Sequence, residues 1–68
     1  MENNIKVITN DPFNPGLLVA TIINSKDIVS KQLIGYGNLD GIKTPVYRFT
    51  YEDGLSEDVF DKWNNLDK

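Results

Sequence analysis

The side chains able to do chemistry in this chain are carboxylates, hydroxyls, lysines and aromatic rings, because the sequence contains no histidine and no cysteine. A nucleophilic serine would therefore have no histidine as its base, and thiolate metal sites are excluded. A carboxylate pair such as Asp53 and Glu57 would need a walled pocket to shift one pKa, and a small domain rarely has room for one. We expect no enzymatic activity and no cofactor.

Four acidic residues near the C-terminus offer oxygen ligands of the kind that calcium and magnesium prefer. They are Asp53, Glu57, Asp58 and Asp61. Their spacing is not that of an EF-hand loop, which also needs a central glycine that this segment lacks. The sequence therefore predicts no metal site.

The excess negative charge lies in the last part of the chain. Residues 52–68 hold six acidic side chains against two lysines, a net charge of −4, whereas residues 1–51 hold four acidic against five basic side chains, a net charge of +1. The acidic segment also carries the single tryptophan. Negative charge beside an aromatic anchor favours a contact surface for a basic partner. The predicted contact residues in this segment are Glu57, Asp58, Asp61 and Trp63.

Local signals predict a C-terminal α-helix over about residues 56–66. Ser56 is a suitable N-cap, and two acidic residues follow it in the first turn, where they complement the helix dipole. Apolar residues recur at helical spacing, at Val59, Phe60, Trp63 and Leu66. A helix this short is unstable alone, so its apolar stripe must pack against a sheet or a partner.

Runs rich in β-branched residues, separated by turn residues, predict four strands. They cover residues 5–9, 17–24, 28–36 and 44–51. The second run is apolar on both faces, which is typical of the middle of a sheet. The third alternates irregularly, which indicates a bulge or an edge position, and a helix over residues 26–33 is the competing prediction.

Four short antiparallel strands and a terminal helix predict one small β-rich (α+β) domain over residues 1–68. The expected architecture is a bent meander or a partly open SH3-like barrel. The tract Val46-Tyr47-Arg48-Phe49-Thr50-Tyr51-Glu52-Asp53-Gly54, followed by a helical tail, resembles the closing strands of Tudor-type and other SH3-like modules. The resemblance implies a fold class and no particular function.

The aromatic row of the fourth predicted strand has three interpretations. Tyr47, Phe49 and Tyr51 share one face, and the simplest interpretation is that this face forms the core. The resemblance to Tudor modules implies instead a cage, completed by Tyr36, for a methylated lysine or arginine. The same rings could stack single-stranded bases. Tyr36 and Tyr47 are therefore also predicted to contact a partner.

Together these features predict a non-catalytic protein-interaction module, an adaptor or small inhibitor of bacterial or phage origin, that binds a basic protein partner through its acidic helix. One alternative is an SH3-like nucleic-acid accessory module using Tyr36, Tyr47 and Arg48, which the sequence pI of about 4.6 disfavours. Another is a self-assembling structural subunit, and a homo-oligomer is left open.

The sequence shows no charged and apolar leader of the secretory type, and no run approaches the length needed to span a bilayer. We therefore expect a cytoplasmic protein without a membrane segment.

Overall fold

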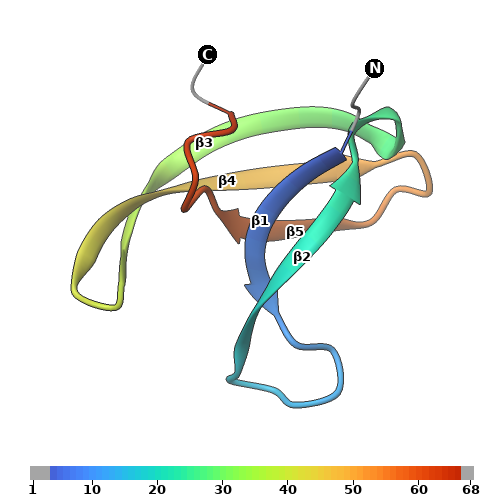
Figure 1. The fold of residues 1–68 in the computed structure, drawn as a ribbon. Coiled ribbons are helices and arrows are strands. Elements are labelled where there is room, and N and C mark those ends of the chain that lie inside the picture. The colour runs from blue at the N-terminus through green and yellow to red at the C-terminus, as the bar shows by residue number, and fades with distance from the viewer. Residues whose placement is uncertain (1–3, 67–68) are drawn as a thin grey trace.

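The computed structural model describes residues 4–66, which form one open antiparallel sheet with no α-helix among them. The strands are β1 (Asn4–Asn10), β2 (Leu18–Asn24), β3 (Ile28–Leu39), β4 (Ile42–Tyr51) and β5 (Ser56–Phe60), and a 3₁₀ turn, η1 (Ser25–Asp27), joins β2 to β3. The strand order is β2-β1-β5-β4-β3, so β2 and β3 are the two edges (Figure 1). Within this described part, no helix has the length and apolar character needed to cross a bilayer.

The predicted helix over residues 56–66 is wrong. Its first half is β5, which pairs with β4 from Thr50↔Ser56 to Val46↔Phe60. The rest, residues 61–66, forms turns, with Asn64 in the left-handed region at φ 57°. The N-cap and dipole signals are local and weak, whereas pairing with β4 supplies a ladder of hydrogen bonds and buries Val59 completely.

The predicted architecture is also wrong, because residues 4–66 form five strands in one open sheet, which is neither a meander nor a partly open barrel. The last strand inserts between the two hairpins: β5 pairs with β4 on one side and meets β1 at Ile8↔Phe60 on the other. A meander would instead have placed β2 beside β3. Since residues 56–66 form a strand and turns where a helical tail was expected, the expected match to Tudor-type closing elements is lost too.

The four predicted strand positions are confirmed, with ends that shift by up to three residues. The irregular third strand is both an edge strand and bulged, with register shifts between Ile28 and Ser30 and between Leu33 and Gly35. The alternative helix over residues 26–33 is therefore excluded. The second predicted strand is correct in extent but wrong in position, since β2 lies at an edge and leaves Ile22 58% exposed.

The β3–β4 hairpin closes through a two-residue turn at Asp40 and Gly41. Leu39 pairs with Ile42, and both turn residues have positive φ, 53° for Asp40 and 80° for Gly41. This is the backbone of a type I′ turn, whose twist matches that of the strands it joins. Asp-Gly is among the sequences most compatible with two successive positive φ angles.

The core forms where the bent sheet brings the β1–β2 hairpin across β4 and β5 (Figure 1). Three side chains at its centre are fully buried: Val7, Phe49 and Val59. Around them pack Ile5, Ile23, Ile28, Tyr47, Tyr51 and Leu66. The simplest interpretation of the aromatic row is thereby confirmed, because its three members belong to the core.

Candidate functional site

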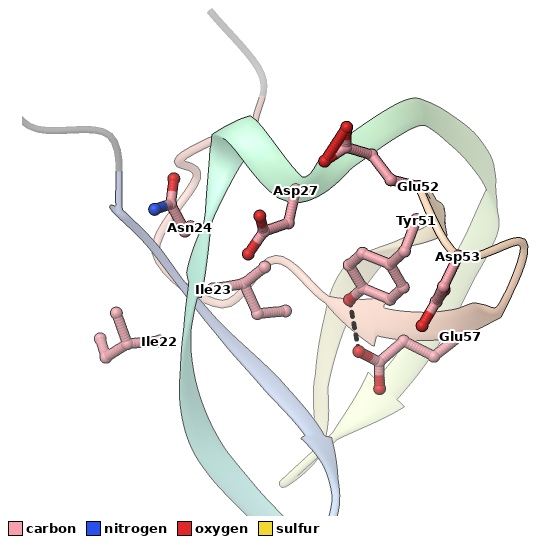
Figure 2. Close-up of a pocket in the computed structure, with 8 residues that line it drawn as sticks. All are labelled: Ile22, Ile23, Asn24, Asp27, Tyr51, Glu52, Asp53 and Glu57. Atoms are coloured by element: carbon pink, nitrogen blue, oxygen red, sulfur yellow. Dashed lines mark hydrogen bonds between the residues drawn. The ribbon is translucent and has the colours of Figure 1, made fainter.

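A cleft of about 480 Å³ opens between the end of β2 and the turn that joins β4 to β5. It is lined by Ile22, Ile23, Asn24, Asp27, Tyr51, Glu52, Asp53 and Glu57 (Figure 2). Four of these residues are carboxylates and none is basic. Figure 2 shows the side chain of Ile23 pointing toward Tyr51, whereas that of Ile22 points to the other side of β2. The cleft therefore combines an apolar wall with concentrated negative charge.

Two turns that are distant in sequence meet to form this cleft. The side chain of Asn24 accepts a hydrogen bond of 2.9 Å from the backbone N–H of Lys26, which caps η1 and places Asp27 at its end. The backbone N–H of Glu52 then donates to the carbonyl oxygen of Asp27 at 3.2 Å. This bond lies next to the last pair of the β3–β4 ladder, Ile28 with Tyr51, and together they bring carboxylates 25 positions apart to one opening.

The β4–β5 turn is held by its own polar groups. The N–H of Gly54 donates to the carbonyl oxygen of Tyr51 at 2.9 Å, and the carboxylate of Asp53 accepts from the N–H of Leu55 at 3.0 Å. Gly54 has a φ of 88°, a conformation that glycine adopts without strain. The turn therefore presents Glu52 and Asp53 from a defined backbone.

Tyr51 and Glu57 form one side of the cleft. The hydroxyl of Tyr51 donates a hydrogen bond to the Glu57 carboxylate (Figure 2). Burial first, and then this hydrogen bond and the negative charge of Glu57, raise the pKa of Tyr51 above its ordinary value. A phenol that keeps its proton more firmly serves as a hydrogen-bond donor and is not activated as a base or nucleophile. The pair therefore holds the Glu57 carboxylate in a defined orientation at the edge of the cleft.

The carboxylates are spread around the opening. Within residues 4–66, no group of three or more acidic side chains converges closely enough to hold a metal ion. Separated carboxylates around an open cleft suit a larger cation, such as a guanidinium or an ammonium group on a side chain.

Of the six residues predicted to contact a partner, Glu57 is the one that lines the cleft. Asp58, its neighbour on β5, lies on the opposite face of the sheet, since successive strand residues alternate. There its carboxylate accepts a hydrogen bond of 2.9 Å from Nε of Arg48, in an exposed ion pair. The charge of Asp58 is therefore already matched within the molecule.

Asp61 has a structural position that its sequence context did not indicate. Its side chain is 1% exposed, and its carboxylate accepts hydrogen bonds from the backbone N–H groups of Asn65 at 2.8 Å and Leu66 at 3.1 Å. Its own N–H donates to the carbonyl oxygen of Pro45 at 2.9 Å. The carboxylate holds the C-terminal turn together and is too buried to contact a partner.

The three predicted aromatic contacts lie outside the cleft. Trp63 is 38% exposed, and Nζ of Lys6 and of Lys62 lie 4.7 Å and 5.4 Å from its ring centre. Tyr36 is exposed on β3, with Nζ of Lys43 at 5.1 Å from its ring centre. Tyr47 packs against the core. With Phe49 fully buried, the row does not present the open set of rings that a cage needs.

Sequence reasoning missed most of the cleft. Its signals were present separately, as acidic residues in two predicted turns, at Asp27 and at Glu52–Asp53. Nothing local shows that the two turns touch. No family model, curated protein or solved structure matches the chain. The geometry of the cleft is therefore the basis for a functional interpretation.

Proposed function

We propose that this protein is a non-catalytic protein-interaction module that binds a basic segment of a protein partner in the acidic cleft. The observation that supports this most directly is the set of four carboxylates around one opening with no basic residue in its lining. By contrast, Asp58 on the opposite face of the sheet is paired with Arg48. Unmatched charge in a concave site favours association with a partner of opposite sign.

The chemistry of the cleft suits a lysine or arginine side chain. Such a side chain has an aliphatic stem, for which Ile23 and the ring of Tyr51 supply apolar contact. Its charged head would lie among the carboxylates of Asp27, Asp53 and Glu57, where charge-assisted hydrogen bonds are the strong ones. An adaptor or a small inhibitor acting in the cytoplasm is the role we propose for such a module.

Two matched variants test this proposal. Asp27→Asn/Glu52→Gln removes two charges from the cleft, and neither carboxylate makes a side-chain hydrogen bond within residues 4–66. Asp11→Asn/Asp58→Asn removes two charges elsewhere. Each tagged protein, shown to be folded by circular dichroism, is used to capture partners from a bacterial lysate at low salt. We expect one stoichiometric partner with a basic binding surface, at least tenfold depleted with the cleft variant and retained by the control.

A partner that both variants retain equally would rule out the cleft as the binding site. A partner lost equally from both would show that net charge alone governs binding. Capture that does not weaken as salt is raised would contradict the electrostatic basis of the proposal.

A further inference from the structure

The two edges of the sheet differ in how well they are protected against pairing with another strand. Edge strands in monomeric proteins are commonly blocked by bulges, charged residues or proline. β3 has two register shifts and carries Lys31 within the strand. β2 has the sequence Leu-Val-Ala-Thr-Ile-Ile-Asn, with no charge, proline or glycine, and pairs with β1 through seven consecutive residues without a bulge.

The free side of β2 is therefore a regular pairing edge. β2 is the terminal strand in the sheet order, so within residues 4–66 its outward N–H and C=O groups face no other strand. Its seven residues span about 20 Å, at about 3.3 Å per residue. Such an edge can accept an extended segment as an additional strand, with backbone hydrogen bonds supplying affinity.

The two ends of β2 border hollows of different chemistry. Its last three residues line the acidic cleft. Its first residue, Leu18, lines a second hollow of about 460 Å³ with Ile8, Gly16, Leu17 and Leu39, and the charged residues Asp40 and Lys62 complete that lining. Leu17 and Leu18 are 52% and 40% exposed. A strand lying along β2 would therefore run from a hollow with several apolar side chains and one charge of each sign to a cleft with four negative charges.

We propose that the partner segment is an extended stretch of about seven residues that pairs with β2, with a lysine or arginine at the acidic cleft and an apolar side chain at the Leu18 end. This inference rests on the proposed function and adds the conformation of the bound segment. Charge complementarity selects a basic segment over a second copy of this chain, since β2 itself carries no basic residue to place in the cleft. The other edge strand, β3, carries Lys31 but is interrupted by two register shifts, so it is a poor pairing partner for β2.

Synthetic peptides test this without altering the protein. The probes are Arg-Thr-Val-Thr-Val-Thr-Leu and its reverse, each also made with Glu in place of Arg. Each Arg peptide is further made in two complementary forms, N-methylated at alternate residues, so that each form loses the donors of one strand edge. Binding is followed by NMR titration, and amide hydrogen exchange is compared between β2 and the control edge β3.

We expect one Arg peptide to bind, its Glu counterpart to bind at least tenfold more weakly, and only one of its two N-methylated forms to bind. Alternate amides of β2 should exchange at least tenfold more slowly in the complex, with those of β3 unchanged. This pattern requires pairing along one edge, which charge attraction alone does not produce.

The other outcomes separate this inference from the proposed function. Equal binding of both N-methylated forms, weakened by Asp27→Asn/Glu52→Gln, would overturn strand pairing and leave the cleft as a site for basic side chains. No binding by any Arg peptide at millimolar concentration would overturn strand pairing. The lysate capture would then test independently whether the cleft binds a basic partner. Concentration-dependent protection of β2 without peptide would show that a second copy occupies the edge, which also overturns the proposal.

Discussion

At the scale of single residues, Asp58 and Asp61 lie three positions apart and their carboxylates have opposite environments. Asp58 is exposed beside Arg48, whereas Asp61 is buried and accepts two backbone N–H groups. Ion pairs at the surface exchange solvation for attraction with little net gain. A buried carboxylate with two donors leaves those donors without an acceptor if it is removed. The two aspartates should therefore respond very differently to the same substitution.

The first prediction compares Asp61→Ala with Asp58→Ala. Loss of the Asp61 carboxylate should lower the free energy of unfolding by about 1–3 kcal/mol, because the N–H groups of Asn65 and Leu66 lose their acceptor. Asp58→Ala should change it much less. Urea denaturation followed by Trp63 fluorescence measures both. Equal effects of the two substitutions would refute the structural role of Asp61.

The second prediction concerns Tyr51 at high pH. Its pKa is raised from 10.0, chiefly by burial and then by the hydrogen bond to Glu57, so the folded protein keeps the phenolic proton at a pH where the unfolded chain has lost it. The stabilisation from Tyr51 should be fully present below about pH 10 and lost as the pH rises through the folded pKa. The free energy of unfolding should therefore fall above pH 10, and fall less steeply in Tyr51→Phe.

Urea denaturation at a series of pH values from 8 to 11 measures this slope in both proteins. Phenolate absorbance in wild type minus Tyr51→Phe gives the titration of Tyr51 itself. A difference curve centred at or below pH 10 would contradict the buried, hydrogen-bonded phenol.

At the scale of elements, β3, β4 and β5 form a ladder whose two faces are both partly covered. One face holds Phe49 and Val59 in the core. On the other, the ring of Phe60 lies against Gly37, where an added Cβ would come within 2.9 Å of Cε2 of that ring and 3.4 Å of Cγ2 of Val46. The absence of a side chain at position 37 is what allows Phe60 to lie across β3 and β4.

The third prediction is that Gly37→Ala overpacks this contact. It should lower the free energy of unfolding by about 1–3 kcal/mol. Phe60→Leu in the same chain should recover part of the loss, because the shorter side chain vacates the space that the new methyl group enters. A double-mutant cycle in urea measures the coupling. If the two effects simply add, the close approach between residue 37 and Phe60 does not control stability.

At the scale of the whole molecule, the net charge of −3 is unevenly placed. Four of the ten acidic residues line one cleft, at Asp27, Glu52, Asp53 and Glu57. Like charges held together raise the free energy of the folded state, and they remain there at the cost of stability. The repulsion between these carboxylates should therefore destabilise the free protein and be relieved when a cationic group binds in the cleft.

The fourth prediction is that Asp27→Asn/Glu52→Gln raises the urea midpoint of the free protein at low ionic strength. The gain should shrink as salt is added, because screening already weakens the repulsion between these exposed groups. Asp58→Asn is the control, since it removes a charge that is paired with Arg48 and should give no gain. A gain that persists undiminished at about 1 M salt would have a non-electrostatic cause.

The sequence determined where the chain extends and where it turns. β-branched runs and Gly, Asn and Asp clusters located four strands and the intervening turns, and the irregular third run indicated the bulged edge that β3 has. Alternation assigned Tyr47, Phe49 and Tyr51 to one face, and that face is the core. These features follow from the sequence because the strand and turn preferences of a residue depend on that residue and its neighbours along the chain.

Tertiary structure alone decided the state of residues 56–66 and the existence of the cleft. An N-cap, two acidic residues and an apolar stripe are compatible with a helix, yet pairing with β4 gives the same residues more hydrogen bonds and buries Val59. The cleft depends on contact between Glu52 and Asp27, and Asp61 is buried because a turn closes around it. Such long-range contacts decide both that residues 56–60 form a strand and where the charges lie, and no local pattern encodes these contacts.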